Sequence, residues 1–171
     1  MPQVSKQRFD EFRANRGVSQ TDAVIEYKLR EEQQKAVEQA KAYFKNHTEE
    51  DAEFLWNAKP RFGKTLSAYD LCKQLDAKTV LIVTHRPAIA TSWYSDYEKF
   101  LGTQSGYYFI SQADALKDKP SVVKRENLPA SARKYIEFVS LQDLKGAIEF
   151  GGKYDKLNHI SKLYIGLSIQ F

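Results

Sequence analysis

The fold is decided by the stretch Ala58-Lys59-Pro60-Arg61-Phe62-Gly63-Lys64-Thr65. An apolar run at 54–58 leads into it and predicts a short strand, and the apolar side of 65–75 predicts a helix after it. A tight loop between a strand and a helix turns its backbone N–H groups inward, and the helix directs the positive end of its dipole at the same point. The stretch therefore predicts a binding site for phosphate groups.

The same stretch matches the phosphate-loop pattern Gly-x-x-x-x-Gly-Lys-Ser/Thr, except that Ala58 stands in the first glycine position. In this pattern Gly63 lets the backbone approach a phosphate closely, and Lys64, the predicted catalytic residue, reaches the β- and γ-phosphates. The hydroxyl of Thr65 is the predicted ligand of Mg²⁺. The predicted nucleotide-binding residues here are Ala58, Lys59, Pro60, Arg61, Phe62, Gly63, Lys64, Thr65 and Leu66. The alternative is a helix start that binds nothing.

The rest of the chain alternates between helical and strand patterns. Apolar residues at helical spacing predict helices, and short β-branched or aromatic runs predict strands. The predicted elements are a helix at 31–44, a strand at 79–84, a helix at 88–100, strands at 107–110 and 135–140, and a short helix at 141–150. This alternation predicts an α/β fold with a parallel sheet and helices on both faces. We divide the chain into a polar leader at 1–28 and a domain at 29–171, with a basic, irregular insertion at 111–134.

The composition limits which classes of protein the chain can belong to. The 171 residues are 42% hydrophobic and 28% charged, which suits one domain with a sizeable core and excludes wholesale disorder. A single cysteine, Cys72, excludes a disulfide framework, and together with a start that lacks a secretory signal it predicts a cytoplasmic location. The apolar runs are far too short to span a bilayer, so no membrane partner is expected. The net charge of +4 is compatible with binding nucleic acid.

Four segments, taken in their order, resemble the first RecA-like lobe of superfamily 2 (DEAD/DEAH-like) helicases and translocases, including the motor subunit of type III restriction enzymes. They are the segments at 29–33, 58–65, 84–87 and 139–142. The resemblance implies a P-loop NTPase of RecA-like fold that uses ATP and Mg²⁺ to move along nucleic acid, DNA more than RNA. It also implies modification or specificity subunits of a restriction system as partners.

The resemblance also assigns roles outside the phosphate loop. Gln33 takes the position whose amide reads the adenine edge, with Arg30 beside it in the nucleotide site. His85 and Arg86 fall in the loop that touches the nucleic-acid backbone. Ser140 and Gln142 fall in the segment that lines the nucleic-acid track. Judged alone, these residues have simpler explanations: a glutamine on a solvated helix face, a surface arginine, and a serine that caps a helix.

Basic residues crowd the insertion and could attract a phosphate backbone, although such a run is more often a solvated loop. They are Lys117, Lys119, Lys124, Arg125, Arg133 and Lys134. The sequence alone leaves both interpretations open.

The sequence departs from the family pattern toward residue 171. Such a lobe should present a strand that ends in Asp-Glu, the Walker B pair that holds Mg²⁺ and orients the attacking water. No acidic residue follows Asp155, although apolar residues alternate as in a strand from Leu163 to Phe171. We therefore expect an incomplete lobe that binds ATP and hydrolyses it poorly, as a truncated or frameshifted product or as a fragment.

Other functions remain open at this point. One is a non-catalytic module that binds nucleotide or nucleic acid, or an inert remnant of a motor protein. Another is a small phosphate-loop kinase. Ala58 and the three further helicase-like segments argue against the kinase.

Overall fold

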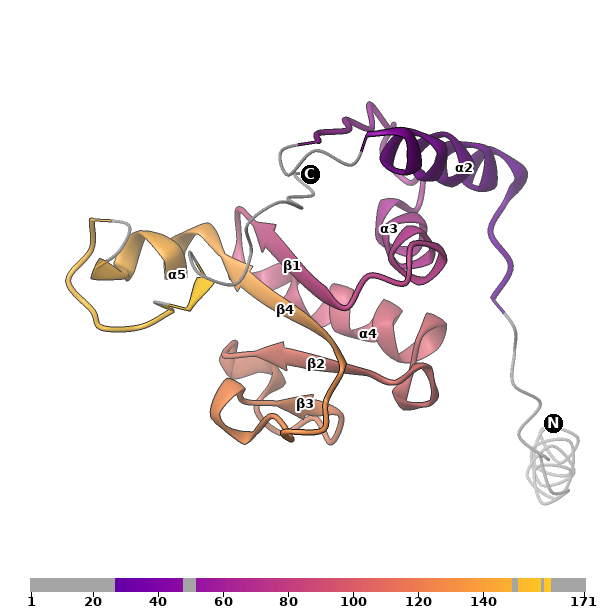
Figure 1. The fold of residues 1–171 in the computed structure, drawn as a ribbon. Helices are drawn as coiled ribbons and strands as arrows, with labels where there is room; N and C mark the ends of the chain where they lie inside the picture. Colours follow the sequence, from indigo (N-terminus) through magenta and orange to yellow (C-terminus); the bar gives the residue numbers. More distant parts are fainter. Residues whose placement is uncertain (1–26, 48–51, 149–150, 158, 161–171) are drawn as a thin grey trace, which may run out of the picture.

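The structure, a computed structural model, describes residues 27–47, 52–148, 151–157 and 159–160. Its centre is a sheet of four strands in the order β1-β4-β2-β3 (Figure 1). The strands are β1 (Thr79–Thr84), β2 (Tyr107–Ser111), β3 (Val122–Val123) and β4 (Lys134–Ser140). Their pairings are all parallel, so the predicted α/β fold with a parallel sheet is confirmed.

The long helices form two layers on one side of the sheet. Helices α3 (Lys64–Gln74) and α4 (Ala90–Phe100) pack against the sheet, and α2 (Glu31–Asn46) lies outside α3 (Figure 1). A short helix, α5 (Leu141–Gly146), follows β4. Single-turn 3-10 helices occur at η2 (Pro87–Ile89), η3 (Thr103–Ser105), η4 (Asp114–Leu116) and η5 (Arg125–Asn127). The elements predicted at 31–44, 65–75, 79–84, 88–100, 107–110 and 135–140 are confirmed within two residues at each end.

An aromatic core joins α4 to the sheet. The rings of Tyr97 and Phe109 have centroids 5.1 Å apart, and both side chains are fully buried. The Tyr97 hydroxyl donates to the carbonyl of Tyr107 at 2.6 Å, and the Tyr107 hydroxyl donates to the carbonyl of Ala77 at 2.5 Å. Because these hydroxyls have partners, the aromatic side chains add apolar contact without leaving a buried polar group unsatisfied.

The opposite face of the sheet is covered by the chain that follows β4. Leu81 and Val139 pack there with Ala147, Leu157 and Ile160. The helix predicted to reach residue 150 ends at Gly146, and the chain continues through an isolated bridge between Ala147 and Tyr154. Both faces are therefore covered, as predicted, but a six-residue helix and an irregular segment form the second cover.

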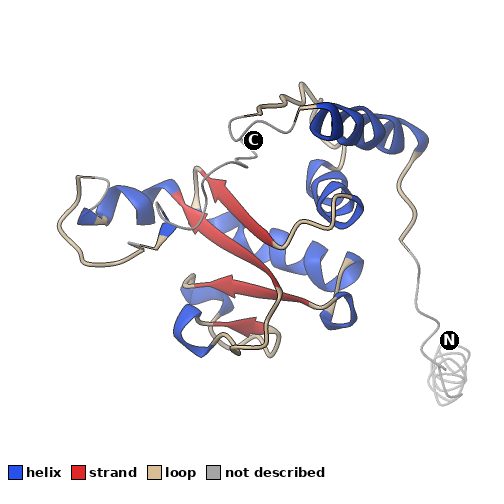
Figure 2. Cartoon of the chain, in the orientation of Figure 1, coloured by secondary structure: helices blue, strands red, loops and turns tan. Residues whose placement is uncertain are grey.

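The prediction of a strand at 54–58 is wrong, because this segment has no regular secondary structure (Figure 2). Its side chains pack on α2 instead. The rings of Phe54 and Phe44 have centroids 6.2 Å apart, and the indole N–H of Trp56 donates to the carbonyl of Ala36 at 3.2 Å. A short apolar run does not reveal whether its partner is a strand or a helix. Here the partner is a helix.

The insertion at 111–134 is more regular than the predicted irregular loop. It contains η4, β3 and η5, and β3 extends the sheet by pairing Val122 with Phe109 and Val123 with Ile110. A strand of two residues is too short to show a period in the sequence, which explains why it was not predicted.

Two predicted features fall outside the described residues. They are the strand-like pattern from Leu163 to Phe171 and the leader at 1–28, except for its last two residues. Among the helices that the structure does describe, none has the length and apolar character needed to cross a bilayer.

Cys72 provides a test of the packing of α3 on the sheet. Its side chain is 2% exposed, and burial raises the pKa of the thiol to about 12. Because the thiolate is the reactive form, we expect no reaction with Ellman's reagent in the native protein at pH 8. The thiol should react fully once urea has unfolded the chain. Rapid stoichiometric reaction without denaturant would show that α3 does not pack as described.

Candidate nucleotide site

The loop before α3 has an unusual backbone. Arg61 and Gly63 both have left-handed conformations, with φ of 64° and 87°, and the N–H of Phe62 donates to the carbonyl of Lys59 at 3.2 Å. Helix α3 then begins at Lys64, and no side chain caps its first turn. The backbone N–H groups of a first helical turn lack partners within the helix. The loop and helix start therefore offer an array of N–H donors that suits an anion.

Helix α2 holds this loop in place. Gln33 is 4% exposed; its side-chain Nε2 donates to the carbonyl of Phe62 at 2.7 Å, and its Oε1 accepts from the N–H of Arg30 at 2.7 Å. The guanidinium of Arg30 donates to the carbonyls of Phe62 and Arg61, at 2.6 and 3.2 Å. These bonds direct two loop carbonyls toward α2. These carbonyl oxygens therefore point away from the start of α3, where they would repel a bound phosphate.

The structure thus brings Arg30 and Gln33 together with the loop, as the predicted nucleotide site requires. The contacts differ from the predicted ones, because the Gln33 amide binds the protein's own backbone here. Reading of the adenine edge by Gln33 stays a prediction.

The catalytic and metal-binding candidates lie at the helix start. Lys64 and Thr65 are half-buried, and no described carboxylate lies within ion-pair distance of Lys64. Among the described residues there is also no cluster of His, Cys, Asp and Glu that could hold a metal ion without a ligand. The Thr65 hydroxyl could take one position on a bound Mg²⁺, an ion that usually also keeps several waters and binds phosphate and carboxylate oxygens.

A cleft of about 620 Å³ lies between α2 and the segment 54–62. This volume is in the range of small-molecule sites. Its wall on α2 consists of Arg30, Glu32, Ala36 and Gln39, and its opposite wall includes the aromatic residues at 54 and 56. Glu32, Ala36 and Gln39 were not among the predicted site residues, although their i, i+4, i+7 spacing places them on one helix face.

The predicted nucleic-acid residues gather at one edge of the sheet. Strands β1 and β4 are parallel and pair Thr84 with Ser140, so the loops that follow them start side by side. His85, Arg86 and Gln142 are exposed there. Ser140 differs, because it is fully buried and its hydroxyl accepts from the N–H of Asp143 at 3.1 Å. Its observed role is to cap α5, the simpler of the two sequence interpretations.

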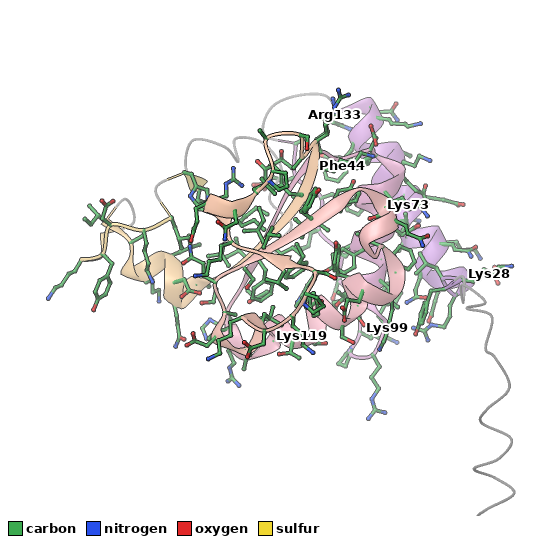
Figure 3. The ribbon with its side chains drawn as sticks, turned by 90° about the horizontal axis from the view of Figure 1, so that it is seen from below. Lys28, Phe44, Lys73, Lys99, Lys119 and Arg133 are labelled. Carbon is green, nitrogen blue, oxygen red and sulfur yellow. The ribbon has the colours of Figure 1, made fainter. Side chains whose placement is uncertain are left out.

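The basic residues of the insertion do not form one patch. Arg125 pairs with Glu137 at 3.1 Å, and Lys134 pairs with Asp76 at 2.5 Å. Lys119 and Arg133 lie at opposite margins of the molecule in Figure 3. The insertion therefore lacks one continuous basic strip, which was one of the two interpretations that its sequence left open.

These features define a class, the α/β P-loop lobe of RecA-like type. The chain belongs to the family described as type III restriction enzyme, res subunit, whose model matches residues 26–165. It is also 32% identical over 140 residues to a protein of Mycoplasma pneumoniae, provisionally named as the C-terminus of the type II restriction enzyme and methyltransferase RM.MpnORF110P. That match covers 80% of the chain and 18% of the relative, so the chain spans less than a fifth of the relative's length. No solved structure matches the chain. The resemblance drawn from the four sequence segments is confirmed at the level of the family.

The close approach of Gly63 to Gln33 leads to a prediction. A Cβ at Gly63 would overlap Nε2 of Gln33, whereas a Cβ at Gly106, which has a similar φ of 78°, would meet nothing within 4 Å. Both Gly63→Ala and Gly106→Ala incur the left-handed strain of about 1–2 kcal/mol. Gly63→Ala also overpacks the Gln33 contact, which typically costs about 1–3 kcal/mol more.

Urea unfolding of the two variants measures this difference. We expect Gly63→Ala to lower the free energy of unfolding by at least about 1 kcal/mol more than Gly106→Ala. Adding Gln33→Ala to Gly63→Ala should remove part of that excess. Equal losses in the two single variants would contradict the described contact.

Proposed function

We propose that this chain is the ATP-binding lobe of a DNA-dependent motor of a restriction system, which couples ATP hydrolysis to movement along DNA in the complete protein. The observation that carries the proposal is the loop at 58–65, held by Arg30 and Gln33 at the uncapped start of α3. Membership of the res-subunit family supports the motor class, and the relative's name supports the restriction context.

In this proposal the phosphates of ATP bind at the first turn of α3. The backbone N–H groups there supply hydrogen bonds and the positive end of the helix dipole. The ammonium of Lys64 balances charge on the β- and γ-phosphates, and the hydroxyl of Thr65 takes one position on Mg²⁺. The bound Mg²⁺ would supply further charge neutralisation at the phosphates. Arg30, the residues from Ala58 to Phe62, and Leu66 complete the site around the loop.

The 171-residue chain should hydrolyse ATP only slowly. Its sequence holds no Asp-Glu pair after Asp155, so it lacks groups that position Mg²⁺ and the attacking water. The buried carboxylate of Glu137 does not replace them, because Arg125 and His159 already bind it. Losing positioning and electrostatic stabilisation removes the terms that supply most of the rate in phosphoryl transfer.

DNA is the proposed track, and modification or specificity subunits are proposed partners, with a cytoplasmic location. Arg86 and His85 after β1 and Gln142 after β4 are exposed at the same sheet edge. Arginine and amide side chains in such loops suit the phosphate backbone.

A second candidate function is a non-catalytic nucleotide-binding module. The observation in its favour is the phosphate loop at 58–65 together with the absence, among the described residues, of a group of acidic or other side chains that could hold a metal ion. It shares the predicted ATP binding and differs in having no role in hydrolysis, even in the complete protein.

Nucleotide binding can be tested on this chain by titration with a fluorescent ATP analogue and Mg²⁺. Removing a charged hydrogen-bond donor costs about 1.5–3 kcal/mol, so Lys64→Ala should weaken binding about tenfold to a hundredfold. Lys73→Ala, an exposed lysine on the same helix, is the matched control and should leave binding unchanged (Figure 3).

Binding that is absent, or that Lys64→Ala does not change, would contradict the proposed site and leave an inert remnant. Steady-state ATP turnover in the presence of DNA then tests the rate of hydrolysis expected of this chain. Robust turnover that depends on Lys64 would contradict the slow hydrolysis expected of this chain.

DNA binding can be tested through its salt dependence. Each phosphate contact adds about 0.7–0.9 to the slope of log affinity against log salt concentration. Arg86→Ala should weaken binding to every sequence alike and reduce this slope by about one. The control is Lys99→Ala in the last turn of α4 (Figure 3). If Arg86→Ala and Lys99→Ala reduce the DNA affinity and its salt dependence equally, DNA does not bind at the sheet edge that carries Arg86.

A further inference from the structure

A carboxylate is buried in the middle of the sheet. Glu137 lies in β4, opposite Leu81 of β1 and Ile110 of β2, and 3% of its side chain is exposed. A charge in such a position is strongly unfavourable unless opposite charges and hydrogen bonds compensate it. The proposed nucleotide and DNA sites do not use this residue, so its retention in the core needs another explanation.

Two segments far apart in the chain supply the compensation. Arg125, from η5 in the insertion, places Nη1 3.1 Å from Oε2 of Glu137. His159, from the segment that follows α5, places Nε2 2.7 Å from Oε1. Each partner therefore binds a different oxygen of the same carboxylate.

Arg125 is held by a second strand residue. Its guanidinium lies 4.6 Å from the centroid of the Tyr135 ring, and its Nη2 donates to the Tyr135 hydroxyl at 3.3 Å. Tyr135 and Glu137 are two positions apart in β4 and thus on one face of the sheet. The arginine is therefore oriented along that face rather than toward solvent.

The space around Glu137 shows whether its carboxylate could bind a ligand or only other side chains of the protein. The cavity that Glu137 lines with Pro87, Ile110 and Leu157 measures about 10 Å³. That is room for one water molecule at most. A substrate or a hydrated cation does not fit, so the carboxylate acts on the protein's own side chains.

We propose that Glu137 is a shared anchor, which fixes both the insertion and the segment around His159 on β4. One buried carboxylate binds both Arg125 and His159, so the attachment of each segment depends on the other. Lys124, next to Arg125, lines a cleft of about 450 Å³ beyond the end of β2. The anchor thereby also determines where this cation lies relative to the sheet edge that carries Arg86.

A shared anchor has a distinctive energetic signature. If one partner is removed, the other still binds the carboxylate. If both are removed, Glu137 loses both of these contacts while it stays buried, which is the costly outcome. The two losses must therefore be more than additive, and the excess must disappear when residue 137 carries no charge.

The test is a set of urea unfolding measurements on the full 171-residue chain. Arg125→Met keeps the side-chain stem over Tyr135, and His159→Phe keeps a ring but removes its N–H. We expect each single variant to raise the unfolding equilibrium constant about threefold to tenfold, and the double variant to raise it at least about tenfold beyond the product of the two. In the Glu137→Gln background the two effects should multiply within about twofold.

If the variant with both Arg125→Met and His159→Phe does not fold, the proposal can still be tested. Adding Glu137→Gln to it should then restore a cooperative unfolding transition in urea. Lys134→Met, which removes the exposed pair with Asp76, is the control and should show no coupling to His159→Phe beyond about twofold. Simple multiplication of the single effects in the wild-type background would overturn the proposal. So would an equal excess in the Glu137→Gln background, or a failure of Glu137→Gln to restore folding.

Discussion

The hydrogen bond from the Gln33 amide to the carbonyl of Phe62 is the contact on which the candidate site depends. A phosphate loop needs its backbone to adopt left-handed conformations, which are strained for any residue but glycine. Arg61 is such a residue, with φ of 64°. The segment before the loop is not paired in the sheet, so it does not hold this conformation as a preceding strand would. Helix α2 takes over that task through Gln33 and Arg30.

The order of elements then relates the two proposed sites. Helix α3 is joined to β1 by a short connection, so it runs back along the strand and its first turn lies toward the strand's carboxyl end. The exposed Arg86 and Gln142 lie at that same end of β1 and β4. Ligands of open parallel sheets bind at the carboxyl ends of the strands. The proposed ATP and DNA sites thus share the edge that such folds use.

Much of this arrangement is readable from the sequence because its signals are local. The β-branched run at β1 has one reasonable interpretation, and so does the Gly63-Lys64-Thr65 start of α3. The apolar run at 54–58 was misjudged because its partner, α2, is a helix and nothing local says so. The ligand-binding role of Gln33 stays a prediction, and no local signal indicates its bond to a backbone carbonyl 29 residues away.

The burial of Glu137 is a second feature that local sequence signals do not predict. A glutamate between Ile136 and Phe138 looks like the solvent-facing position of a strand. Its partners are 12 and 22 residues distant, at Arg125 and His159. No period or motif links these residues, so only the folded arrangement shows that the position is internal. For the same reason Arg125 was grouped with a basic strip that the structure does not form.

In this structure α2 holds the loop so that a phosphate site stands ready at the start of α3. A comparison of backbone amide NMR shifts with and without ATP and Mg²⁺ tests this arrangement. We expect the largest shifts at the N–H groups from Gly63 to Leu66, with smaller ones at Gln33. Shifts that leave those amides unchanged while ATP binds elsewhere would contradict this arrangement.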